Sequence, residues 1–462
     1  MNIVLIAILI YVSFQLVLGF IVSRRIHTED DYLLAGRKLG YGLATFSIFA
    51  TWFGAEACIG TSGAAYREGL YGATADPFGY GLCLIVMGVV FAVPLWKRKL
   101  TTVADMLRQR YSFRAERIAA LVIAPASLFW AAAQIRAFGQ VLSASSELTV
   151  VAAITIAACM VIAYTVMGGL LADAISDLIQ GTVLIIGLLL LLPIVLGEFG
   201  GVAAAYNTIS PERLSFFPPE SESGTRSVFL VIESWAIPIC GSVLAQEIIA
   251  KVLASRSHVV AKRSAISAGM IYLMIGLVPL SMGLVGLKLF PNIADPEHIL
   301  PMMAQTYFST ALYVIFAGAL VSAILSTVDS ALLAASALIS RNVIGSLYPD
   351  MTDKQRLLTG RLGVVVMGCI AYMLALHAEG VYNLVLDASS FGSAGLFVVA
   401  VFGLFTKFGG ANSAIAALVS GAVVWVTGNY IFDFDFSYIA SLSAAFGMYV
   451  ITALAERKNT VE

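Results

Sequence analysis

Oxygen-bearing side chains interrupt an apolar stretch, SAILSTVDSALLAAS, at residues 322–336. Ser326, Asp329 and Ser330 stand there at positions i, i+3 and i+4, so they share one face of a helix. A carboxylate at the centre of a bilayer costs about 2.5 to 3.5 kcal/mol on insertion scales, so a membrane segment that carries one is expected to use it. Hydroxyl and carboxylate oxygens suit hard cations, which indicates a site for sodium or a proton and not for zinc or copper.

A second acidic pair lies in GGLLADAISDLIQG, residues 168–181. Asp173 and Asp177 are four residues apart and therefore face the same side of a helix. We expect Asp173 to reach cytoplasmic water and assign it no role, whereas Asp177 lies one turn deeper and is the better candidate for an ion. The alternative for the hydroxyl groups is structural, because serine and threonine in membrane helices commonly bond to a carbonyl of their own helix.

The composition excludes a water-soluble globule. Sixty per cent of the residues are hydrophobic and 12% are charged, and the mean hydropathy is +0.91, which is more apolar surface than one soluble domain can bury. Apolar runs of about 20 residues predict an all-α integral membrane protein and not a barrel. The net charge of −1 gives no reason to expect a nucleic-acid partner. The histidines lie near segment ends and the cysteines form no CxxC pair, so we expect no metal cluster other than a sodium site, and no enzyme.

Thirteen membrane spans are predicted from the apolar runs and the breaks between them. Of the 27 basic residues, 22 fall in alternate loops, which places the N-terminus outside and the C-terminus in the cytoplasm of a multi-pass protein of the cell membrane. The first apolar segment lacks a charged start and a cleavage site, so it is expected to be a retained helix and not a signal peptide. The spans begin near residues 2, 40, 72, 117, 149, 170, 227, 264, 310, 359, 381, 411 and 435.

Two of these spans carry residues that break helices. Gly54 lies in the apolar run 44–63, and Pro238 and Gly241 lie in the run 233–247. Backbone carbonyls released by such residues persist at membrane depth only where they are buried in protein or face a wet cavity. The two runs are the second and seventh spans, and interrupted helices at matching positions indicate a transporter built from inverted repeats, with its site at the midplane. Ordinary glycine-mediated packing is the alternative for either break alone.

The same segments carry a family resemblance. GGLLADAISDLIQG resembles the signature of the sodium:solute symporter family, and ALVSAILSTVDSALLAASALISRNV resembles that family's ion-binding helix. The resemblance implies a LeuT-like core of two inverted five-helix repeats, with one extra N-terminal helix and two extra C-terminal helices. The expected division is an N-terminal helix and loop at 1–39, a first repeat at 40–200, an extracellular loop at 201–226, a second repeat at 227–408 and the C-terminal helices at 409–462.

The resemblance also implies how sodium would be held between the first and eighth core helices. A sodium site would use the carbonyls of Ala50, Phe53 and Ala323 with the side-chain oxygens of Ser326 and Thr327. Some relatives have an additional site, which would map to Asp177, Ser326, Asp329 and Ser330. Asp329 stands where relatives have a hydroxyl, so a second carboxylate could tighten sodium binding or hold a proton instead, and the sodium stoichiometry stays open.

Three aromatic residues, Trp52, Tyr80 and Trp130, are similar to residues that cage the cationic head group in the choline-transporter branch, where aromatic faces attract quaternary ammonium. The IPWQ motif of that branch reads VLAQ here, so Ala245 replaces a further tryptophan and the cage is incomplete. The alternative is that the aromatics fill the bundle core.

Charged residues near the expected pocket supply the remaining substrate candidates. Asp76 and Glu56 could balance a cationic solute, while Arg136 could pair with one of them or hold a substrate carboxylate. Gln246 is a candidate for the pocket edge. We expect sodium-coupled import of a small polar organic solute, with a cationic or quaternary amine favoured. Import of an amino acid or carboxylate, or proton coupling through Asp329 and Asp177, is the alternative. A single chain in the lipid bilayer is expected to suffice, and the oligomeric state is open.

Overall fold

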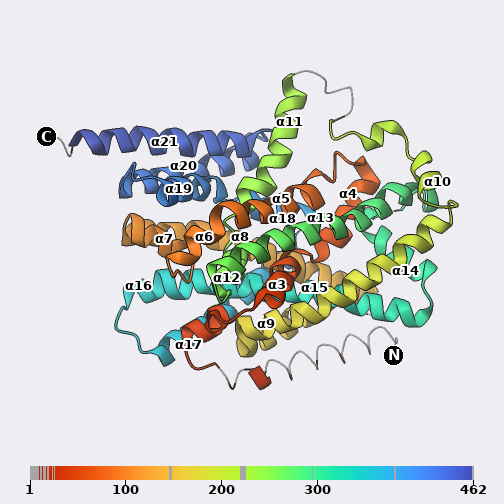
Figure 1. The fold of residues 1–462 in the computed structure, drawn as a ribbon, viewed down its shortest axis with the longest axis horizontal. Helices are drawn as coiled ribbons and strands as arrows, with labels where there is room; N and C mark the ends of the chain where they lie inside the picture. Colours follow the sequence, from red (N-terminus) through yellow and green to blue (C-terminus); the bar gives the residue numbers. More distant parts are fainter. Residues whose placement is uncertain are drawn as a thin grey trace.

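The computed structural model of the chain describes residues 26–144, 148–218, 225–293, 295–378 and 381–459, with isolated positions between 10 and 24. These residues form a bundle of long helices, and no β-strand occurs among them. The helices run across the molecule side by side in Figure 1. At the centre, α15 (Thr310–Ala337) packs against α8 (Phe113–Ala144) and α9 (Val150–Gly197), while α13 (His258–Leu289) packs against α3 (Tyr41–Trp52).

Ten helices in the described part of the chain are long and apolar enough to cross a membrane, and twelve if each of two bent pairs is one span. They coincide with the second to thirteenth predicted spans, which confirms an all-α membrane protein. The predicted first span, near residue 2, lies outside the described residues, so the total of thirteen stays a prediction. The ten are Thr74–Lys97, Phe113–Ser143, Val150–Met167, Gly169–Gly197, His258–Leu289, Thr310–Leu347, Asp353–His377, Leu384–Phe405, Ala411–Tyr430 and Ser437–Arg457.

Both predicted broken helices are bent pairs. The first joins α3 to the run Glu56–Glu68, which contains the helical turn η2 (Glu56–Gly60) and α4 (Thr61–Glu68), at 58°. The second joins the run Arg226–Gly241 to α12 (Gln246–Ala254) at 43°, and Pro238 lies in the turn η7 (Ile237–Gly241) just before the break. Proline lacks the N–H that would bond to the preceding turn, so the hydrogen-bond ladder is already weakened one turn before the break.

Two membrane spans meet inside α9 at Gly169. This glycine has φ +56°, a left-handed conformation that residues with a Cβ rarely adopt. A Cβ there would also lie 2.7 Å from the ring of Tyr32, in α2 (Glu29–Leu34), so only glycine fits. The second span of α9 begins at this turn and carries Asp173 and Asp177 within its first three helical turns.

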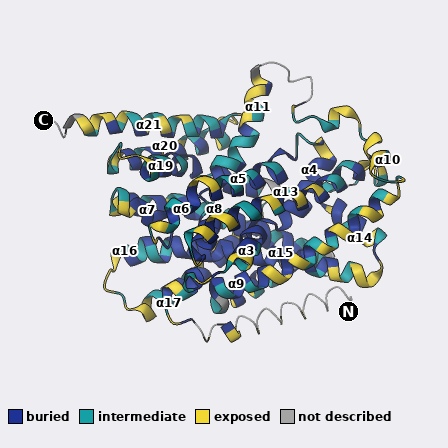
Figure 2. Ribbon diagram, in the orientation of Figure 1, coloured by how far each residue is buried: buried dark blue, intermediate teal, exposed yellow. Residues whose placement is uncertain are grey.

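The exposed surface is apolar along the outer helices, as a lipid-facing surface requires. Figure 2 shows buried residues around α3 and α15 and exposed ones along the edges of the bundle. Ile186 and Val366, on α9 and α17 (Asp353–His377), are 52% and 54% exposed. The C-terminal helices α20 (Ala411–Tyr430) and α21 (Ser437–Asn459) pack on each other along one side (Figure 1).

Candidate ion and solute sites

The break in α3 faces the middle of α15. The hydroxyl of Thr327 lies 3.4 Å from the carbonyl oxygen of Ala50 and 3.1 Å from that of Ala323. Because α3 ends at Trp52, carbonyls of its last turn lack the amide donors that a continuing helix would supply. A Cβ on Gly54 would lie 2.7 Å from the Thr327 hydroxyl, so the close approach of the two helices requires glycine. The structure therefore brings together Ala50, Ala323 and Thr327, with Phe53 buried at the same break.

A residue that the sequence did not single out, Gln134 of α8, also lies at this break. Its side-chain oxygen accepts a hydrogen bond from the backbone N–H of Ala55 at 3.2 Å, and its Nε2 is buried without a partner among the described residues. Gln134 thus fixes the start of the second half of the broken helix. One glutamine in the apolar segment LFWAAAQ was its only signal in the sequence.

The acidic pair of α9 surrounds a lysine from the second broken helix. Lys251 Nζ, on α12, pairs with Asp173 and lies 3.1 Å from Asp177 Oδ2. All three side chains are fully buried. Hydroxyls complete the cluster: Ser326 donates to Asp177 Oδ1, Ser47 donates to Asp177 Oδ2 at 2.6 Å, and Ser330 donates to Asp173 Oδ2 at 3.0 Å.

Two expectations are wrong at this cluster. Asp173, expected to reach cytoplasmic water, is 1% exposed. Lys251, one of the 22 basic residues that the sequence assigns to cytoplasmic loops (here residues 251–263), lies inside α12, which continues to Ala254. The ammonium can be buried because two carboxylates compensate its charge. The number of basic residues in this loop, on which the predicted membrane orientation depends, is therefore lower by one.

Asp329 has hydrogen-bond partners other than those of Asp177. It is 7% exposed and accepts a hydrogen bond from the hydroxyl of Thr165. The carbonyl of Thr165 accepts in turn from the hydroxyl of Tyr32 at 3.0 Å. No hydrogen bond joins Asp329 to Asp177 in the described part of the chain. Of the four residues predicted as a second sodium site, Asp177, Ser326 and Ser330 thus belong to the Lys251 cluster, whereas Asp329 bonds to Thr165.

The three predicted aromatic residues form one cluster. Trp52 and Trp130 are stacked, with ring centroids 5.8 Å apart, and Tyr80 packs edge-on at 5.3 Å from Trp52 and 6.1 Å from Trp130. Each is at most 5% exposed. The hydroxyls of Tyr80 and Ser389 are 2.8 Å apart, which ties the cluster to α18 (Val381–Ser390).

The predicted charged residues take different positions. Asp76 is fully buried, and its Oδ2 accepts a hydrogen bond from Tyr272 at 2.7 Å. Glu56 is buried beside Tyr80 and interacts electrostatically with Asp76. Arg136 donates to the carbonyl of Ala375 at 3.1 Å, and within the described ranges it forms no ion pair with either carboxylate.

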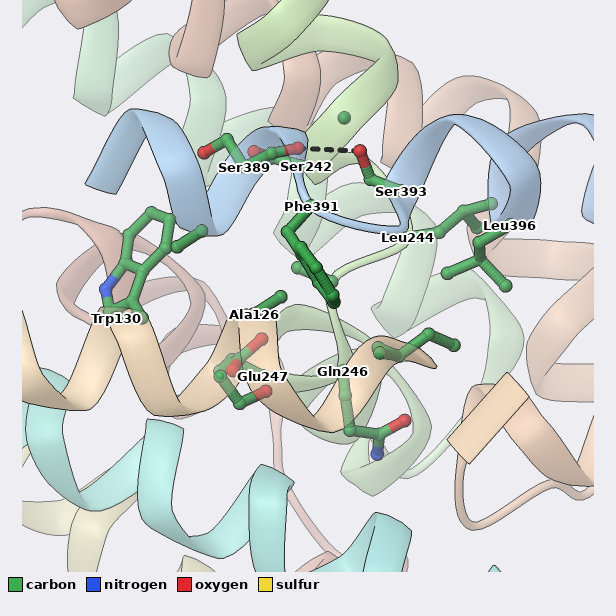
Figure 3. A pocket seen from close by; sticks show the side chains of 15 residues that line it. Ala126, Trp130, Ser242, Leu244, Gln246, Glu247, Ser389, Phe391, Ser393 and Leu396 are labelled. Carbon is green, nitrogen blue, oxygen red and sulfur yellow. Dashed lines mark hydrogen bonds between the residues drawn. The ribbon is translucent and has the colours of Figure 1, made fainter. Parts of the chain in front are cut away.

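A small cavity of about 30 Å³ begins beside this aromatic cluster (Figure 3). Trp130 and Ser389 line it from α8 and α18, Phe391 from the turn after α18, and Ser242 and Glu247 from the break before α12 and its first turn. Three buried polar atoms of the lining lack a hydrogen-bond partner among the described residues: Trp130 Nε1, Ser242 Oγ and Glu247 Oε1. Such atoms are expected where a polar ligand binds.

Gln246 lines the same cavity, but its amide is engaged elsewhere. Its Oε1 accepts from the backbone N–H of Val103 at 2.8 Å, and its Nε2 lies 3.4 Å from the carbonyl of Thr101. Gln246 therefore joins α12 to α7 (Val103–Arg110) at the cavity edge. Glu247, the next residue, has a carboxylate oxygen, Oε1, that is free, among the described residues, to accept a hydrogen bond from a ligand in the cavity.

Residues 32–421 match the sequence profile of the sodium:solute symporter family. Similar proteins include the human high affinity choline transporter 1, 27% identical over 92% of this chain and 76% of the transporter. The high-affinity proline transporter PutP of Bacillus subtilis is 25% identical over 95% of this chain and 96% of PutP.

Solved structures share the fold. A Na+-coupled sialic acid symporter, in a substrate-bound outward-open state, matches with a TM-score of 0.84 and 18% identity, over 97% of this chain and 96% of the symporter. Mhp1, a nucleobase-cation-symport-1 family transporter in a closed conformation, matches with a TM-score of 0.63 and 16% identity, over 92% of this chain and 94% of Mhp1. The fold is thus that of membrane transporters.

Proposed function

Because the chain belongs to the sodium:solute symporter family, we propose that it couples the inward movement of sodium to import of a small polar organic solute by alternating access. The observation that carries this proposal is the Thr327 hydroxyl facing the Ala50 carbonyl at the break of α3. Carbonyl and hydroxyl oxygens are the donors that a hard cation prefers. Sodium would be held there by Ala50, Phe53, Ala323 and Thr327, and Ser326 is adjacent.

A cation at this position would couple the ion to the solute. It would hold α15 against the broken helix and so favour one of two conformations, which solute binding then completes. The division into two inverted repeats, 40–200 and 227–408, and a cytoplasmic C-terminus belong to the same proposal.

The energetics are sufficient for uptake against a gradient. One sodium ion crossing about 100 mV contributes roughly 2.3 kcal/mol, and a tenfold sodium gradient adds about 1.4 kcal/mol. The total of roughly 3.7 kcal/mol could concentrate a neutral solute a few hundredfold.

The cavity favours a solute with a cationic amine. Trp130 and Phe391 offer aromatic faces that attract an ammonium group, and Glu247 offers an unpaired carboxylate oxygen. Glu56 and Asp76 add two buried carboxyl groups near the aromatic cluster. Similarity to choline transporters agrees with this class.

An amino acid is the second candidate. The unpartnered Trp130 N–H and Ser242 hydroxyl could both donate hydrogen bonds to a substrate carboxylate. An amine and a carboxylate together describe a zwitterion, and the similarity to a proline transporter agrees with it.

The test is a thermal-shift screen of the purified protein, followed by uptake into proteoliposomes. Choline, betaines, amino acids, polyamines, carboxylates and sugars are each added with sodium and with an equal concentration of potassium. We expect sodium-dependent stabilisation by one chemical class and saturable uptake of that class driven by a sodium gradient. Uptake that is indifferent to sodium, or driven by a proton gradient alone, would contradict the proposal.

A further inference from the structure

Lys251 places an ammonium group among residues that the family resemblance assigns to an additional sodium ion. Its ammonium lies 3.1 Å from Asp177 Oδ2 and pairs with Asp173 on the same side of α9. Its side chain is fully buried. From the geometry we infer that the Lys251 ammonium takes the place of a second sodium ion, so that this chain couples transport to a single sodium. The inference rests on the proposed function and specifies its ion stoichiometry.

The oxygen atoms around Asp177 are already used. One carboxylate oxygen accepts from Ser326, and the other accepts from Ser47 at 2.6 Å and from Lys251. Hydroxyls that donate to a carboxylate can still turn toward a metal ion, whereas the Lys251 ammonium is held in its charged form by its pairing with two carboxylates. A sodium ion bound to Asp177 would stand within a few ångströms of Nζ, and two like charges at that distance repel strongly in a buried site.

Unlike a free ion, the ammonium is covalently attached to one of the helices that it joins. Lys251 belongs to α12, the second half of the broken helix, whereas both of its carboxylate partners belong to α9. Ser330 and Ser326 add bonds from α15 to the same two carboxylates. A sodium ion would leave the site in each transport cycle, but a tethered ammonium contributes no ion to the stoichiometry and carries no net charge across the membrane.

The cluster retains capacity for a metal ion once the ammonium is removed. Asp173 Oδ1 is buried without a hydrogen-bond partner among the described residues. Replacing Lys251 by methionine keeps an unbranched side chain of similar length but leaves two carboxylates and three hydroxyls without a cation. These are hard oxygen ligands, which a sodium ion can bind.

The test counts sodium ions bound to the purified full-length chain with 22Na+ in a scintillation proximity assay. We expect one ion per wild-type chain, with a Hill coefficient near 1, and one additional ion in Lys251→Met. Lys251→Arg keeps the positive charge and should bind as many ions as the wild type. The additional ion should be lost again in Lys251→Met/Asp177→Asn.

A second variant protects the test against misfolding. Lys251→Met/Asp173→Asn leaves a single carboxylate, Asp177, with the Ser47 and Ser326 hydroxyls, and should also gain one ion. Size-exclusion chromatography identifies the folded variants. A wild type that already binds two ions, or folded variants that gain none, would overturn the inference. A wild type that binds none would overturn the proposed sodium coupling and with it the stoichiometry of one, whereas a gain of one ion in Lys251→Met would still show that the ammonium takes the place of a sodium ion.

Discussion

The Thr327 hydroxyl lies 3.4 Å from the Ala50 carbonyl, across the point where α3 ends and α15 passes. Replacing Thr327 by alanine removes one oxygen ligand from the proposed sodium site. A hydrogen bond to a charged group contributes about 1.5 to 3 kcal/mol, and a lost ion ligand of similar strength would raise the sodium concentration for half-maximal uptake about tenfold or more. Sodium titration of uptake in proteoliposomes measures this.

The control for that variant is Thr182→Ala. Thr182 is exposed on α9, and its hydroxyl donates only to the Leu178 carbonyl of its own helix among the described residues, at 2.7 Å. Its sodium dependence should equal that of the wild type. Equal sodium dependence of Thr327→Ala, with normal expression, would contradict the assignment of Thr327.

Gly54→Ala tests the same site by adding a methyl group that would crowd it, without removing an oxygen ligand. The new methyl group would lie 2.7 Å from the Thr327 hydroxyl and 3.0 Å from Gln134 Oε1. One of these groups must move, so we expect sodium-dependent thermal stabilisation to be lost. Gly318→Ala on α15 is the matched control, because nothing lies within 4 Å of its added Cβ and helix propensity favours alanine. Retained sodium stabilisation in Gly54→Ala would show that the site lies elsewhere.

The sequence predicted well the features that depend on the residue type at one position, such as the breaks in the two helices. Gly54 and Pro238 lie at or just before the two breaks, so residue type was enough to locate both bends. The break in α3 and the hydroxyl groups of α15 could both be recognised in the sequence. That Ala50, Ala323 and Thr327 lie next to one another could be predicted only from the family resemblance.

What the sequence missed depends on which side chains meet across helices. Lys251 lies three residues before the end of α12, where a lysine is indistinguishable in sequence from one in a cytoplasmic loop. Its burial depends on Asp173 and Asp177, which lie in a different part of the chain. Gln134 was missed because its partner, the backbone N–H of Ala55, also lies in a distant part of the chain. Long-range polar pairing is not encoded in local spacing.

Asp329→Asn should weaken ion coupling more than folding. The amide oxygen can still accept from the Thr165 hydroxyl, so the stability loss should stay below about 1 kcal/mol. Removing the negative charge beside the Lys251 cluster should lower the solute accumulation reached at a fixed sodium gradient. Thr165→Val, which removes the hydrogen bond and keeps the charge, should destabilise the protein more and change accumulation less. Unchanged accumulation in Asp329→Asn would exclude a role for its charge.

Glu247→Gln should weaken binding of a cationic solute while leaving sodium binding intact. The variant replaces the carboxylate next to the cavity by a neutral amide of the same shape, and interactions with charged groups are worth about 1.5 to 3 kcal/mol, so the KM for uptake should rise about tenfold or more. Glu233→Gln gives the contrast. Glu233 accepts from the backbone N–H groups of Tyr438 and Ile439 at 2.6 and 2.9 Å and so caps α21, so its variant should lower the thermal midpoint without raising KM. If the KM of Glu247→Gln matched that of the wild type, the solute's cationic group would have to bind elsewhere, and the buried carboxylates of Glu56 and Asp76 would be the next to replace.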